Sequence, residues 1–132
     1  MDIIAQITSY LKNNVNLNGL PVVSPILNPD NSVAIRETPS SIVNRYMNTE
    51  KTFNFQFQIL VKHDKTITLR NIINEIFTKL DGLPSGAISS AKGSFFMSKC
   101  ECYSSPSFVE KTETNHVIYS AIFNAEIEIG GN

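Results

Sequence analysis

The sequence predicts an α+β fold, with a single mixed or mainly antiparallel sheet of four to five strands and two helices packed on one face. Two kinds of pattern carry this prediction. Two segments repeat apolar residues every three or four positions, as amphipathic helices do, and longer segments alternate apolar with polar residues, as one-sided strands do. The chain has 132 residues, the size of one domain, so we expect residues 1–132 to form a single domain.

The two predicted helices cover residues 2–13 and 66–80. In each, the apolar side chains fall on one face, which indicates a helix that docks on a sheet. Thr66 or Asp64 is expected to cap the start of the second helix, and the Asp81-Gly82 pair to end it. The apolar faces consist of Ile3, Ile4, Ile7, Tyr10 and Leu11, and of Leu69, Ile72, Ile73, Ile76, Phe77 and Leu80.

The clearest predicted strand is residues 52–62, where five apolar side chains from Phe53 to Val61 alternate with polar ones. Residues 32–38, 94–104 and 116–129 are predicted as further strands. Residues 40–52 lack periodicity and are predicted to be an extended loop. After the first helix, Asn16, Asn18 and Gly19 are followed by prolines at positions 21, 25 and 29, so the stretch to Asn31 is either a loop or an interrupted edge strand.

One layer of helices covers only one face of a sheet, so the opposite face is expected to meet solvent or another molecule. That face is mostly polar, yet the alternation also places Leu60, Ile118 and Ile122 on it. These three residues are either a small patch that a neighbouring subunit buries or ordinary exposed aliphatic side chains. We name them as candidate contact residues.

Composition excludes several classes of protein. The chain is 42% hydrophobic and 17% charged with a net charge of −1, which argues against disorder and against a strongly charged partner. No apolar run approaches the ~20 residues of a membrane-spanning helix, so no membrane partner is expected. The N-terminus lacks the layout of a secretory signal, which indicates synthesis in the cytoplasm of the producing cell. The sequence contains no basic stripe with interleaved aromatic residues, so sequence-specific nucleic-acid binding is not expected.

The sequence also predicts that the protein is not an enzyme and holds no cofactor. It contains no nucleotide-binding glycine motif, no nucleophile elbow and no metalloprotease motif. A zinc site built from Cys100, Cys102, His63 and His116 is conceivable, but the paired C-x-x-C spacing is absent. We therefore expect free thiols, with no catalytic, cofactor-binding or metal-binding residues.

Charge is unevenly distributed along the chain. From Arg36 to Arg70 there are six basic and three acidic residues, and from Glu101 onward five acidic and one basic. This asymmetry suits head-to-tail contact between copies, or an acidic surface past which DNA slides, and Glu126 and Glu128 are the candidates for that surface. An ordinary solvated surface with uneven charge is the alternative.

Several segments together resemble a known family. They are residues 33–41, which read VAIRETPSS, the tripeptide Arg45-Tyr46-Met47, and residues 53–62, which end in Gln58-Ile59-Leu60-Val61-Lys62, with the helix through Leu80. The order and length of these elements resemble the minor capsid and tail-terminator (tail completion) proteins of long-tailed bacteriophages and prophages. Those proteins likewise have an N-terminal helix, a short strand with a P-x-S type ending, a variable loop, a long strand and a helix.

The resemblance implies a structural virion protein of the tail and neck. Such a protein forms a homo-oligomeric ring, commonly a hexamer, that caps the tail tube, ends its polymerisation and meets the neck or head-completion protein, with DNA passing through the lumen. Arg36, Arg45 and Tyr46 lie in the matched stretch and are candidate contact residues, because arginine and aromatic side chains are enriched at interface centres. Two other functions stay open: a neck connector that joins portal and tail, and a small monomeric binding or catalytic module.

Overall fold

The computed structural model describes residues 3–38, 41–45, 51–88 and 95–129, with the backbone alone for residues 41–45, 51–53 and 129. Within these residues the chain forms two helices and six strands. In chain order they are α1 (Ile3–Asn14), β1 (Val22–Val23), β2 (Ser32–Glu37), β3 (Ser41–Arg45), β4 (Lys51–His63), α2 (Thr66–Leu80), β5 (Phe96–Lys111) and β6 (Val117–Ile129).

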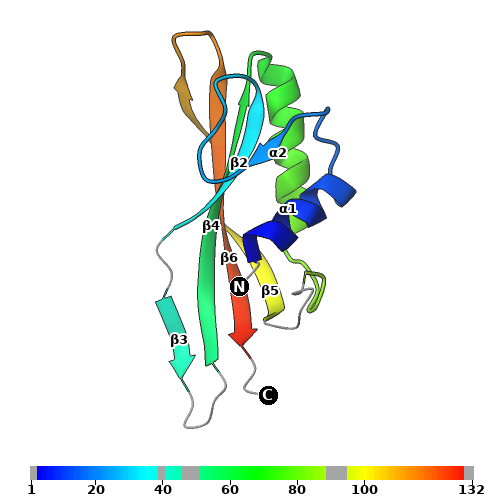
Figure 1. Ribbon diagram of the computed structural model, residues 1–132, viewed down its shortest axis with the longest axis vertical. Coiled ribbons are helices and arrows are strands. Elements are labelled where there is room, and N and C mark those ends of the chain that lie inside the picture. The colour runs from blue at the N-terminus through cyan, green and yellow to red at the C-terminus, as the bar shows by residue number, and fades with distance from the viewer. Residues whose placement is uncertain (1–2, 39–40, 46–50, 89–94, 130–132) are drawn as a thin grey trace.

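The strands form one mixed sheet in the order β1-β2-β4-β6-β5, and β3 pairs with the first residues of β4. Only β1 and β2 run parallel, and every other pairing is antiparallel. Figure 1 shows both helices beside the same face of this sheet, and the β3–β4 hairpin reaching beyond them at the lower end. The predicted α+β architecture is confirmed.

The main core lies between the two helices and the sheet face that they cover, which we call the helix side. Alternate residues of β4 and β6 point into it, so Phe57 and Phe123 stack with ring centroids 5.5 Å apart. Both rings are fully buried. The helices contribute the apolar stripes that the sequence predicts, and their fully buried members are Ile7, Leu11, Leu69, Ile72, Ile73, Ile76 and Leu80.

The structure corrects three sequence predictions. Residues 41–45, predicted as loop, form strand β3, whose backbone pairs with β4 from Ser41↔Asn54 to Arg45↔Lys51. Strand β5 continues to Lys111 instead of ending near residue 104, because shifts of register accommodate Pro106, which lacks the N–H that a regular ladder needs. Both errors arise because strand pairing depends on a neighbouring strand that a local pattern does not show.

The third correction concerns the start of α2, where neither Thr66 nor Asp64 caps the helix. The N-cap residue is Lys65, and no side chain caps it. The carboxylate of Asp64 instead accepts a hydrogen bond from Asn31 Nδ2 at 3.2 Å, which lowers the pKa of Asp64. At the other end, Asp81 is the C-cap residue and Gly82 follows with a positive φ of 77°, as the sequence predicts.

The Phe57–Phe123 stack supplies a test of this core. We expect Phe57→Ala to lower the free energy of unfolding by about 3–5 kcal/mol, because it leaves a cavity between strands and helices. Urea denaturation followed by circular dichroism measures the change. Phe96→Ala is the matched control, since Phe96 is partly exposed and its loss should cost much less. Equal losses for the two variants would contradict this description of the core.

Candidate subunit interface

The sheet face opposite the helices, called here the far face, carries an open groove at one end. Its volume is about 310 Å³. Loop residues and side chains from β2, β4, β5 and β6 line it, and most of them are apolar. The lining residues are Pro25, Ile26, Leu27, Arg36, Leu60, Val109, Glu110 and Ile118. The fold thus brings Arg36, Leu60 and Ile118, three of the predicted contact residues, to one place.

The prediction of an uncovered apolar patch on the far face is wrong in one respect. Leu60 and Ile118 are only 8% and 7% exposed, because Val23 and Leu27 pack on them and complete a second small cluster around Ala34. Residues 20–31, which the sequence leaves as a loop or broken edge strand, provide this cover. Leu60 and Ile118 therefore form the floor of the groove, and Ile122 is half-buried nearby on the same face.

The exposed apolar side chains at the groove are Ile26, 77% exposed, and Val109, 45% exposed. Hydrogen bonds hold the loop that carries Ile26 in place. Lys62 Nζ donates to the carbonyl of Asn28 at 3.2 Å, and the Asn28 N–H donates to Ser32 Oγ at 3.1 Å. Sequence reasoning missed Ile26 and Val109, because neither lies in an alternating segment that assigns it to a face.

Arg36 borders the groove as an exposed cation, and Glu110 lines the same groove. Its Nε donates to Gln58 Oε1 at 2.7 Å, which orients the guanidinium. Within the described part of the chain, no hydrogen bond or ion pair engages the two terminal nitrogens. A guanidinium held in this way presents a planar donor pair that matches a carboxylate.

The rest of the far face is a network of polar side chains. Asn124 Oδ1 accepts hydrogen bonds from Gln56 Nε2 at 3.0 Å and from Asn54 Nδ2 at 3.3 Å. Ser98 Oγ donates to Glu126 Oε1 at 2.8 Å, while Glu128 is exposed at the same end of β6. Both carboxylates lie on the far face, and their role toward DNA stays a prediction. Amides and carboxylates in this arrangement form no nucleophile and base pair.

Two predicted contact residues lie at the limit of the structure. The backbone of Arg45 pairs with Lys51 at the end of β3, and its side chain is outside the described residues. Tyr46 lies wholly outside them. Their proposed role in contacts therefore stays a prediction.

Strand β5 forms one edge of the sheet, and part of its outer side is open. Residues 81–86 cover the first part, where Gly82 N–H donates to the Cys100 carbonyl at 2.8 Å and Cys102 N–H donates to Asp81 Oδ1 at 2.8 Å. Beyond Cys102 no further strand lies beside β5 among the described residues. Tyr103, 66% exposed, is the first residue of this open edge, and sequence reasoning missed it.

The charge asymmetry of the sequence does not divide the sheet into a basic and an acidic edge. Strand β2 carries Arg36 and Glu37, and the four charged residues of β5 are two lysines and two glutamates. Glu126 and Glu128 add acidic charge on β6. Head-to-tail contact between copies therefore stays a prediction.

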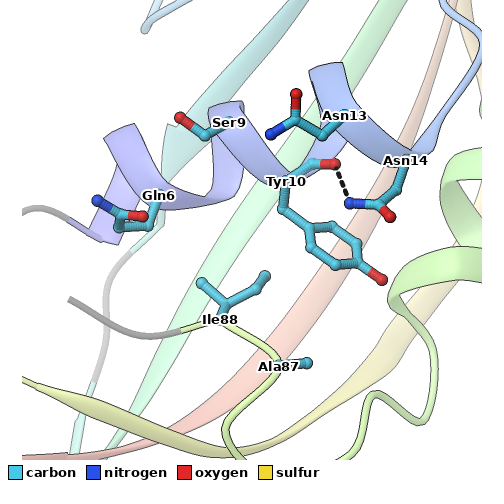
Figure 2. Close-up of a pocket in the computed structure, with 7 residues that line it drawn as sticks. All are labelled: Gln6, Ser9, Tyr10, Asn13, Asn14, Ala87 and Ile88. Carbon is cyan, nitrogen blue, oxygen red and sulfur yellow. Dashed lines mark hydrogen bonds between the residues drawn. The ribbon is translucent and has the colours of Figure 1, made fainter. Parts of the chain in front are cut away.

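A second, more polar pocket of about 250 Å³ lies between α1 and the loop after α2. Figure 2 shows the amide and hydroxyl side chains of α1 above Ala87 and Ile88. Asn14 Nδ2 donates to the carbonyl of Tyr10 at 2.9 Å. The pocket is lined by Gln6, Ser9, Tyr10, Asn13, Asn14, Ala87 and Ile88, so it contains neither a carboxylate nor a histidine that could act as a general base.

The four residues of the conceivable zinc site are not brought together. His63 pairs with Val117 at one end of β6, whereas Cys100 pairs with Ala125, eight residues further, or about 27 Å along the strand. Both cysteines are free thiols. Across the residues that the structure describes, no three His, Cys, Asp or Glu side chains are placed to hold a metal ion. Neither described helix is long and apolar enough to span a membrane.

The cysteines should differ from ordinary thiols in reactivity. Burial, with a smaller effect of Asp81, raises the pKa of Cys100 to about 12 and also raises that of Cys102. The thiol of an unfolded cysteine has a pKa of about 8.5. The raised pKa of Cys100 therefore contributes stability to the folded state that is fully present below about pH 8.5 and is lost as the pH rises through the folded pKa. At about pH 8.5 we expect iodoacetamide to label Cys100 only after unfolding, with Cys102 slow in the native state. Mass spectrometry of timed samples would contradict this if Cys100 were labelled equally fast in both states.

The cover over the groove floor yields a stability test. We expect Leu60→Ala to lower the free energy of unfolding by about 2–5 kcal/mol, since the side chain is buried within its own chain. Ile26→Ser, at an exposed position of the same groove, should change it by no more than about 0.5 kcal/mol. Thermal unfolding of both variants measures the difference. An unchanged stability for Leu60→Ala would show that the side chain is uncovered, contrary to this structure.

Comparison with known proteins agrees with this architecture. The family described as bacteriophage tail terminator protein matches residues 27–129. Among solved structures, a chain from the virion of a native gene transfer agent particle has a TM-score of 0.65 at 15% identity, covering 94% of this chain and 92% of that chain, which shows a shared fold. Comparison with curated proteins finds no match. The family match covers most of the chain and confirms the predicted resemblance. The protein therefore belongs to the bacteriophage tail terminator family and is a structural protein of the virion tail.

Proposed function

We propose that the chain assembles with its own copies, most simply six, into a ring on the end of the tail tube. The ring ends polymerisation of the tube and contributes to joining the tail to the head through a neck protein. The family supports this function, and the observation that carries it is the division of the sheet. The helix side is buried by α1 and α2, whereas the far face and the open edge of β5 present exposed apolar side chains and charges of both signs.

The proposed mechanism is steric and needs no turnover. A head-to-tail contact between two different surfaces of the chain generates a ring when its rotation closes, so each copy uses the same two surfaces. A closed ring on the tube end occupies the surface that the next tube subunit would bind. If the end of β6 that carries Glu126 and Glu128 lines the lumen, these carboxylates repel the phosphates of passing DNA and keep it from adhering.

Tube growth in vitro tests the proposed function. The tail tube protein is allowed to polymerise with and without this chain, and tube lengths are measured by negative-stain electron microscopy. We expect the chain to shorten the tubes and to appear as a cap at one end, because it blocks addition of further subunits. An equal amount of an unrelated protein of similar size is the control.

A neck connector would give a different result in the same experiment. It would bind the head side of a finished tail and leave the lengths of growing tubes unchanged. Unchanged tube lengths across a range of ratios would therefore rule out termination by this chain.

A further inference from the structure

We propose that the ring contact seats Tyr103 of one copy in the groove of the next copy, with Glu101 of the first copy facing Arg36 of the second. The inference rests on the proposed ring and names the surfaces that build it. It assigns an acceptor surface, the groove with Arg36, and a donor surface, the β5 edge with Glu101 and Tyr103.

The registers of the sheet place the two surfaces within about two residues of the same level. Arg36 of β2 pairs with Gln58 of β4, Gln58 pairs with Ile122 of β6, and Ile122 pairs with Ser104 of β5. One row of the sheet therefore runs from Arg36 to the residue after Tyr103. Copies in a ring are related by rotation, which keeps height along the axis unchanged when the strands run roughly along it. In neighbouring copies Glu101 then lies two residues from the level of Arg36, and Tyr103 lies about two residues from the level of Leu60. Both pairs share this offset of roughly 7 Å, which long side chains can span.

Tyr103 lies at a bulge in the open edge of β5. The register shifts between Cys102 and Ser104, which pair with Phe123 and Ile122, so Tyr103 is an extra residue without a partner position on β6. Its ring is mostly exposed, and no aromatic or cation–π contact engages it among the described residues. Exposed, rigidly presented tyrosines are frequent anchors of protein interfaces.

The groove suits an aromatic side chain better than a larger ligand. Its 310 Å³ lies at the lower limit of about 300–1,000 Å³ for ligand pockets. Leu60 and Ile118 provide an apolar floor, and the exposed Ile26 stands at one wall. A tyrosine ring on this floor would cover Ile26 while its hydroxyl stays in reach of water at the open side.

Charge complementarity between Arg36 and Glu101 favours a second copy of the chain as the occupant of the groove. Glu101 pairs with Asn124 in the sheet and so lies on the far face, as Arg36 does. Glu101 is exposed, with Lys99 Nζ 3.5 Å from its Oε1, and an exposed pair of this kind contributes little stability. The groove is lined by one cation, Arg36, and one carboxylate, Glu110, so the incoming carboxylate is placed at the Arg36 side. The terminal nitrogens of Arg36 can bind that carboxylate, and the same donor and acceptor exist on every copy. Like charges placed at this contact would oppose assembly.

The contact can be tested with two charge-reversal variants, which compensate each other only when they lie in neighbouring copies of the ring. One variant carries Arg36→Glu and the other Glu101→Arg. Alone, each variant forces like charges together at every contact, so we expect at least a tenfold loss of assembly. Mixed in equal amounts, they can alternate around an even-numbered ring with every contact of opposite sign. We therefore expect the mixture to regain most of the wild-type assembly.

Assembly is measured by multi-angle light scattering of the free protein and by co-sedimentation with tail tubes, and circular dichroism checks that each variant is folded. Tyr103→Ala should also weaken assembly, whereas Ile67→Ala, at a position on α2 that is 77% exposed, is the control and should not. Lys99→Ala controls for loss of the Lys99–Glu101 pair. Singly changed variants that assemble like wild type, or a folded mixture that stays unassembled, would overturn the proposed contact.

The same experiment separates this inference from the proposed function. If the wild-type protein shortens tubes but the mixture of the two variants does not assemble, the proposed termination of tube growth is retained and only this contact is disproved. If the wild-type protein neither associates with tubes nor shortens them, both the proposed ring and the proposed contact are disproved.

Discussion

The pairing of β4 with β6 is the constraint on which the rest of this structure depends. Thirteen residues of each strand pair without interruption from Lys51↔Ile129 to His63↔Val117. Because side chains alternate, a slip of one residue would turn Phe57 and Phe123 out of the core and polar residues into it. Burial of these rings under α1 and α2 therefore fixes the register, and the register fixes which residues reach the far face.

From this pairing follow the different properties of the two sides. The helix side encloses a continuous apolar core, so its surface is made by the outer faces of α1 and α2. The far face has only the short cover of residues 20–31 over Leu60 and Ile118 and a polar network elsewhere. A structural subunit benefits from this division, because the core stabilises each copy and leaves the far face and the edges for contacts. This chain is a structural protein of the virion tail, because it belongs to the tail terminator family.

Much of the fold could be predicted because its main elements are long and periodic. The strand around Phe57 and the helix from Thr66 to Leu80 show their burial directly in the sequence. β3 could not be found in this way, since five residues form a strand only when β4 offers an edge. The cover over Leu60 was also hidden, because three prolines in residues 20–31 leave no periodic pattern.

The candidate interface was predictable in part. Alternation placed Leu60, Ile118 and Ile122 on the far face, and the family resemblance singled out Arg36 nearby. Tyr103 escaped prediction because it owes its exposure to a bulge, and a bulge arises from the mismatch between two paired strands rather than from either strand alone.

Hydrogen–deuterium exchange of the chain, free and bound to tail tubes, tests most directly the claim that the sheet's far face and edges are its assembly surfaces. We expect slower exchange on assembly in the loop around Ile26, at the end of β2 and at the open edge of β5, with little change in α1 and α2. Slower exchange confined to the two helices, with the β5 edge unchanged, would contradict this account.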